Sequence, residues 1–151
     1  MRSRAALLGI VLAGVAALAA CGGLATSGTV PVIMCVLPAG TQVALAYPVP
    51  GATGVPDSPG QIVVAVSSPL PATWQVVVEV PGQVATGGAL LTAILPSAIP
   101  TPYATPSFAS PAYETSGLTG SLPAASTVQI GLNDESSDCN SYPLIGSFTT
   151  H

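Results

Sequence analysis

The chain contains no lysine, and its only two arginines, Arg2 and Arg4, stand at the amino terminus. Its single histidine is the last residue, His151. A long stretch without cations cannot neutralise phosphates, so the sequence excludes nucleic acid as a partner and attraction to anionic lipid head groups. It also leaves no well-placed imidazole base for a serine, threonine or cysteine nucleophile, because a terminal residue is prone to fray.

Carboxylates are also few, and three of the six, Asp134, Glu135 and Asp138, lie in one short polar loop. A glycosidase needs two carboxylates across a larger cleft, so we predict no enzyme activity and no cofactor. The loop is a candidate calcium site, although no established calcium-loop spacing is present and a solvated hairpin explains the same residues. No other metal site is expected from one histidine and three cysteines.

Low charge does not indicate disorder here. Only 5% of the residues are charged, but 49% are hydrophobic, whereas disordered chains lack apolar residues. The length allows one hydrophobic core and is too short for two.

Residues 1–20 are typical of a secretory leader. Arg2 and Arg4 form a short basic region, and an apolar run of small and aliphatic residues follows up to Ala20. The run has the length of a signal-peptide core and is short for a membrane span, which needs roughly 20 apolar residues. An uncleaved membrane anchor is the alternative.

The end of this leader, Leu18-Ala19-Ala20-Cys21, resembles the lipobox of bacterial lipoproteins. The resemblance implies cleavage before Cys21, a diacylglycerol on its thiol and a further acyl chain, such as palmitate, on its amino group. Two or three acyl chains give firm membrane anchoring. We therefore expect a cell-envelope protein, lipid-anchored through Cys21 and facing the periplasm or the exterior.

Two cysteines remain, Cys35 and Cys139. In an oxidising compartment an even pair predicts a disulfide, which would close a loop of about 100 residues. Two free thiols or an intermolecular bridge are the alternatives.

After a small, polar stretch, alternating apolar residues predict short strands at 43–47, 61–67, 74–80, 126–132 and 145–150. The apolar run 89–95 is a further strand, though a helical turn has the same pattern. With frequent glycine and proline turns, this predicts an all-β fold, a single antiparallel sandwich of about seven strands. The domains are then a signal peptide (1–20), a flexible tether (21–34) and the sandwich (35–151).

Residues 96–111 carry four prolines beyond Pro96 and the aromatic residues Tyr103 and Phe108, followed by Tyr113. Such proline spacing favours extended backbone at a sheet edge. The segment is either a proline-protected edge, which we favour, or a recognition loop whose binding surface is Tyr103, Phe108 and Tyr113. Trp74 is interpreted as a core residue rather than a ligand platform.

Residues 47–56 (YPVPGATGVP), followed by the strand 62–66 and by 67–71 (SSPLP), resemble the opening of bacterial Ig-like domains of the surface-layer type. The stretches 122–127 (LPAAST) and 146–150 (GSFTT) are similar to the closing half of those domains. The resemblance implies an Ig-like sandwich with an envelope-associated structural or binding role and no shared catalytic residues.

Together these patterns predict a lipid-anchored envelope protein whose Ig-like domain is non-catalytic and has a structural, assembly or spacer role. The alternative is a binding module for a glycan, a peptide or an envelope protein, using residues 100–113 or the exposed face of the strand that begins at Trp74.

Overall fold

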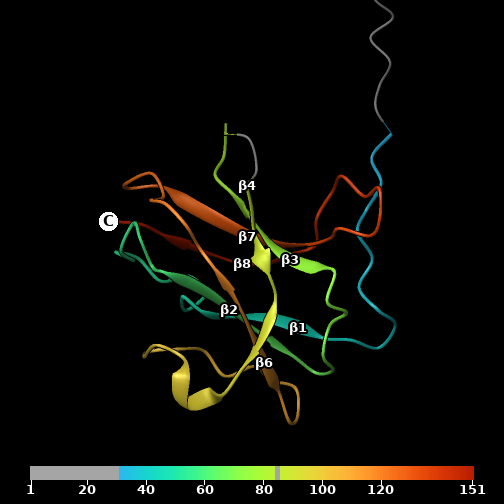
Figure 1. The fold of residues 1–151 in the computed structure, drawn as a ribbon. Coiled ribbons are helices and arrows are strands. Elements are labelled where there is room, and N and C mark those ends of the chain that lie inside the picture. The colour runs from blue at the N-terminus through green and yellow to red at the C-terminus, as the bar shows by residue number, and fades with distance from the viewer. Residues whose placement is uncertain (1–30, 84–85) are drawn as a thin grey trace, which may run out of the picture. The chain divides into compact units, whose positions relative to one another are not determined.

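The computed structural model describes residues 31–83 and 86–151, which include a compact unit, Pro31–His151, built from two four-stranded antiparallel sheets (Figure 1). The first sheet contains, in spatial order, β1 (Val43–Tyr47), β2 (Gln61–Val66), β6 (Ala112–Gly117) and β5 (Thr92–Ile94). The second contains β4 (Thr86–Leu90), β3 (Trp74–Glu79), β7 (Thr127–Asp134) and β8 (Leu144–Thr149).

The strand order is that of an immunoglobulin-like sandwich. Immunoglobulin constant domains place strands A, B, E and D in one sheet and C, F and G in the other. The first sheet has the same A-B-E-D order, and the second is C-F-G with β4 added at the edge. The predicted all-β sandwich is confirmed, with eight strands in the described residues instead of about seven.

One of the additional strands is β6, a central strand that the sequence analysis did not predict. It pairs with β2 along its whole length, from Val66↔Ala112 to Gln61↔Gly117. Glu114 and Ser116 are buried on the face of β6 that points between the sheets. Tyr113 is buried on the opposite face, in the outer cluster described below. Because the positions facing the core are polar, β6 lacks the apolar alternation that predicts a strand.

The predicted single strand 89–95 is instead divided between the sheets. β4 pairs with β3 in the second sheet, and β5 pairs with β6 in the first. Between them Leu91 is buried in the core, and its amide donates to the carbonyl of Trp74. Figure 1 shows this path running from one sheet to the other along one side of the sandwich.

The opposite side is closed by the connection after β1. The amides of Gly51 and Val55 donate to the carbonyls of Ser147 and Thr149 at 2.7 and 3.1 Å, and Val55 forms a parallel bridge with Thr150. The edge of β8 is therefore already paired with backbone from the same chain, which protects it from pairing with another chain.

The main core lies between the sheets and is built from the inward residues of both. Trp74 is 2% exposed and Phe148 is 1% exposed. Its other buried members include Leu45, Ile62, Val64, Val66, Val76, Val78, Val128, Ile130 and Leu132. Burial of Trp74 agrees with its interpretation as a core residue.

A second apolar cluster covers the outer face of the first sheet. It contains Val63 and Ala65 of β2, Ala46 of β1 and Tyr113 of β6, closed over by Ile99. Ile99 belongs to residues 96–111, which we call the cover segment; it begins with the 3₁₀ turn Pro96–Ala98. β2 is consequently buried on both of its faces.

Candidate functional site

The predicted lipidation site Cys21, the leader and most of the predicted tether lie outside the described residues. Within residues 31–83 and 86–151, no helix is long and apolar enough to cross a membrane.

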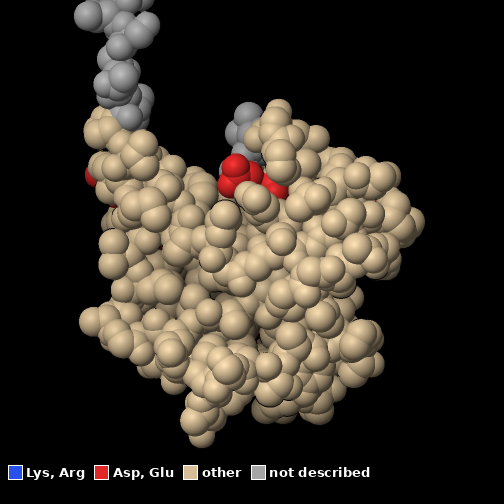
Figure 2. Space-filling model, turned by 180° about the vertical axis from the view of Figure 1, so that it is seen from behind, with Lys and Arg blue, Asp and Glu red and all other residues tan. Residues whose placement is uncertain are grey.

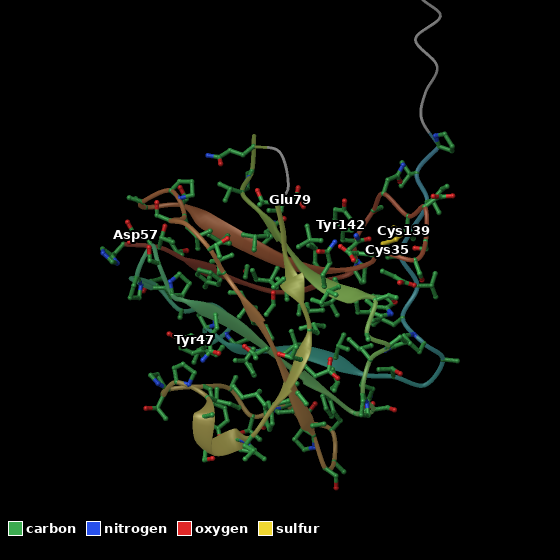
Figure 3. All side chains as sticks on the ribbon, in the orientation of Figure 1. Cys35, Tyr47, Asp57, Glu79, Cys139 and Tyr142 are labelled. Atoms are coloured by element: carbon green, nitrogen blue, oxygen red, sulfur yellow. A yellow bond between two sulfur atoms is a disulfide. The ribbon has the colours of Figure 1, made fainter. Side chains whose placement is uncertain are left out.

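The predicted disulfide between Cys35 and Cys139 is present (Figure 3). The two Cα atoms are 5.0 Å apart, which lies in the usual range for a disulfide. Asn133 Oδ1 lies 3.3 Å from each sulfur atom, and the hydroxyl of Ser137 donates to the sulfur of Cys139 at 2.9 Å. The bond joins the segment before β1 to the loop between β7 and β8.

Hydrogen bonds reinforce this junction. The Asn140 side chain accepts from the amide of Ile33 at 2.8 Å and donates to the carbonyl of Pro31 at 2.9 Å. The amide of Cys35 donates to the carbonyl of Ser141 at 2.8 Å. Residues 31–34, placed in the tether by the sequence analysis, thus lie against the β7–β8 loop and form part of the compact unit.

The acidic loop is organised as a turn. One carboxylate oxygen of Asp134 accepts from the amide and the hydroxyl of Ser136, at 3.0 and 2.7 Å. Hydrogen bonds from the Ser136 and Thr73 hydroxyls, together with the Ser136 amide, lower the pKa of Asp134. In the part of the chain that the structure describes, no three His, Cys, Asp or Glu side chains, including Glu135 and Asp138, gather to hold a metal ion.

The aromatic residues predicted as a binding surface pack against the first sheet. Tyr113 is buried, and Tyr103 and Phe108 are half-buried against the same cluster. The rings of Tyr103 and Tyr113 meet edge to face with centroids 6.0 Å apart, a favourable arrangement for aromatic pairs. These side chains hold the cover segment on the sheet and do not form a free aromatic platform.

Glu114 is the one acidic residue buried in the described structure, at 6% exposure. Its Oε1 accepts from the amide of Leu70 at 3.0 Å, while its Oε2 is buried without a partner among the described residues. Burial raises the pKa of Glu114, and the Leu70 amide partly offsets this rise. Glu114 does not line any of the three hollows described below, so we assign it no ligand.

A polar groove of about 500 Å³ lies on the outer face of the second sheet. We call it the outer-face groove. Its lining residues come from β3, β7, the β7–β8 loop and β8, and they are Glu79, Gln129, Asn140, Ser141, Tyr142 and Leu144.

The floor and one wall of this groove follow from strand register. Glu79 of β3 is paired directly with Gln129 of β7, so both side chains stand next to each other on the outer face. Two residues further along each strand, on the same face, Val77 is paired with Gly131. A Cβ at Gly131 would lie 3.0 Å from Cβ of Tyr142, a tight contact that would push the loop a few tenths of an ångström away from the sheet.

The other wall is Tyr142 and its loop, which the disulfide and the Asn140 hydrogen bonds fix in place. Figure 3 shows Glu79 and Tyr142 on the same side of the molecule as the disulfide. Within the described residues, the side chains of Glu79, Gln129 and Tyr142 make no hydrogen bond to protein, which leaves their polar atoms available to a ligand.

The electrostatic character of the groove is simple. No lysine or arginine occurs after Arg4, and Glu79 is the only charged residue in the lining. Figure 2 shows one face of the molecule, where acidic atoms occupy small areas among residues that are neither acidic nor basic.

A second, apolar groove of about 570 Å³ lies between residues 47–56 and Thr101 with Pro102. Its walls are mainly proline, valine and the Tyr47 ring. A third hollow of about 110 Å³ lies between Val78 of β3 and residues 118–123, which follow β6.

No protein-family model, no curated protein and no solved structure matches this chain.

The outer-face groove was not predicted from the sequence. The exposed face of the strand that begins at Trp74 was named as an alternative binding surface, but Gln129, Ser141 and Tyr142 carried no signal of their own. The available signal was the outward alternation of β3 and β7, whose outward residues become neighbours only once the two strands pair in register.

Proposed function

We propose that this chain is a lipid-anchored protein of the bacterial cell envelope whose Ig-like domain is non-catalytic and serves as a structural, assembly or spacer module. The observation that carries this proposal is the Cys35–Cys139 disulfide. Disulfides persist in exported proteins and are rare in the cytosol, so the bond supports the secretory leader and the lipobox at Leu18–Cys21.

The position of the disulfide also suits an anchored domain. Counting from Cys21, the compact unit begins ten residues later, at Pro31. The next few residues are held to the β7–β8 loop by the disulfide and by Asn140. A lipid on Cys21 would therefore be linked through residues 22–30 to a segment that the disulfide joins covalently to the rest of the domain.

The resemblance to surface-layer-type Ig-like domains supports the assembly role. The stretch 47–56, which carries much of that resemblance, forms the corner that leaves β1 and pairs with β8. The A-B-E-D order of the first sheet agrees with an Ig-like fold.

The test is expression of the full chain and of Cys21→Ser in a bacterium. We expect the wild-type chain to fractionate with membranes and its amino-terminal peptide to carry the mass of a diacylglycerol and an acyl chain, whereas Cys21→Ser loses both. The matched control is the double change Cys35→Ser and Cys139→Ser, which should keep the lipid and the membrane fraction. A wild-type chain with residues 1–20 attached and an unmodified Cys21 would refute the proposal.

A second role, ligand binding, is favoured by the outer-face groove, whose polar lining is held in place by the disulfide-linked loop.

A further inference from the structure

We propose that the outer-face groove binds an uncharged glycan, with Gln129, Glu79 and Tyr142 as its principal contacts. The inference deepens the binding role above and rests on the proposed export of the domain, since it places a saccharide ligand outside the cytosol.

The charge of the groove limits which class of ligand can bind there. The described domain has no lysine or arginine, and the groove contains the carboxylate of Glu79. A phosphate, sulfate or uronate would meet no cation and one negative charge, which is unfavourable at short range. A cation would find a single carboxylate, where calcium prefers six to eight oxygen ligands. A neutral ligand is therefore favoured.

The available polar atoms then suit a ligand rich in hydroxyl groups. Gln129 offers a carbonyl acceptor and an NH₂ donor, and Glu79 beside it offers acceptors only. Ser141 and Tyr142 add hydroxyl groups, each able to donate and accept. Sugar hydroxyls, which donate and accept in the same way, can satisfy such a mixed set, whereas a purely apolar ligand would leave it unpaired.

The Tyr142 ring supplies the apolar part of the contact. A tyrosine offers a large, stiff, amphipathic surface at low entropic cost, and the faces of a sugar ring carry C–H groups that can lie against it. The loop carrying Tyr142 approaches the sheet closely over Gly131, where a side chain would push it outward, and the Cys139 disulfide holds it there. Such preorganisation lowers the cost of ordering the site on binding.

A peptide is the principal competing ligand, and extended peptides often bind by adding a strand to a sheet edge. The β8 edge of the second sheet is already paired with residues 51–55 of the same chain. The groove lies on the sheet face, where contacts are made by side chains, so glycan binding is the better fit.

The experiment uses the full chain, purified in a detergent without a sugar head group. The probes are an array of neutral glucose, galactose, mannose and N-acetylglucosamine oligomers, with uronic acid oligomers and extended peptides as counterparts. We expect binding to at least one neutral oligomer and not to the acidic or peptide probes. Gln129→Ala and Tyr142→Ala should each weaken that binding by about tenfold or more.

Gln75→Ala is the matched control, because Gln75 lies on the same outer face of β3 and does not line the groove. It should change the affinity by less than about twofold. Urea unfolding followed by the fluorescence of Trp74 checks that every variant is folded. Cys21→Ser should keep glycan binding, so failure of lipid anchoring and failure of glycan binding are separate results.

Three results would overturn the inference. They are binding of no neutral oligomer, binding confined to the acidic or peptide probes, and glycan binding that folded Gln129→Ala and Tyr142→Ala leave intact.

Discussion

The two sheets present very different outer faces. The outer face of the first sheet is dry, because the cover segment packs Ile99, Tyr103 and Phe108 onto β2 and its neighbours. The outer face of the second sheet carries the polar outer-face groove between β3, β7 and the disulfide-linked loop. The first face is covered by a segment of the same chain, and the second is open to a ligand.

The difference can be followed in single strands. All five residues of β2 after Gln61 are buried, and they form the uninterrupted apolar run 62–66. β7 instead alternates, with Val128, Ile130 and Leu132 inward and Gln129 on the outer face. An uninterrupted run indicates a strand covered on both faces, whereas alternation indicates one face in water. The cover segment supplies the second cover that the β2 sequence requires.

The largest expected effect comes from placing a charge on each outer face in turn. Val63→Asp would bury an unpaired carboxylate beneath the cover segment, where Val63 is fully buried. We expect a loss of at least about 4 kcal/mol in the free energy of unfolding. Urea denaturation followed by the single tryptophan measures it, since Trp74 is buried in the folded state.

The matched change on the other sheet is Thr127→Asp, at an exposed position at the start of β7. It should cost less than about 1 kcal/mol. Similar costs at the two positions would contradict the proposed contrast between a covered and an open face.

The next effect concerns the disulfide, which fixes the wall of the open face. Replacing Cys35 and Cys139 by alanine should lower the free energy of unfolding by about 2–5 kcal/mol. Hydrogen exchange should accelerate at the amides of residues 35 and 141, which donate across the junction to the carbonyls of Ser141 and Ile33. The amide of Ala104, bonded to the carbonyl of Ala46 under the cover segment, should be unaffected at native-state conditions. Equal acceleration at both places would show that the two regions do not open separately.

The smallest effect is the pH dependence produced by Glu114, on the inner side of the first sheet. Burial raises its pKa in the folded state, so between the unfolded and folded pKa values the folded chain holds a proton that the unfolded chain has lost. The contribution of Glu114 to the free energy of unfolding is therefore greatest below the unfolded-state pKa and decreases as pH rises through the folded-state pKa.

Glu114→Gln should remove this slope, as measured by urea denaturation across the window just above the pKa of an unfolded glutamate. Asp134→Asn is the contrasting variant, because the folded-state pKa of Asp134 is lowered and its contribution is instead lost as pH falls. An unchanged slope in Glu114→Gln would show that Glu114 is not the source.

Much of the sandwich could be predicted from sequence, because alternation with period two directly reports which residues face a core. That holds for β1, β3, β7 and β8. β2 was predictable from its apolar run, and the disulfide from the pair of cysteines left after Cys21. It does not hold for β6, where Glu114 and Ser116 occupy inward positions. Nor does the apolar run 89–95 reveal that the chain changes sheets at Leu91, which is buried while Leu90 and Thr92 on either side of it are exposed.

The candidate site was less predictable than the fold. Glu79 and Gln129 are ordinary outward residues, distant in sequence, and they become neighbours only through the pairing of β3 with β7. Tyr142 reaches them because Gly131 leaves space for its loop, a relation between two residues that no local pattern contains. Tyr103 and Phe108 of the cover segment were predicted only as an alternative binding surface, and they pack against the cluster on the first sheet.

The Cys35–Cys139 bond also has a mechanical consequence. A pull applied between the amino-terminal segment and His151 would pass from Cys35 directly to Cys139, because the covalent bond is the shortest path. Strands β1 to β7 belong to the closed loop and would bear little of that load. Only the final stretch containing β8 could be drawn out, so the domain would have a fixed limit to its extension.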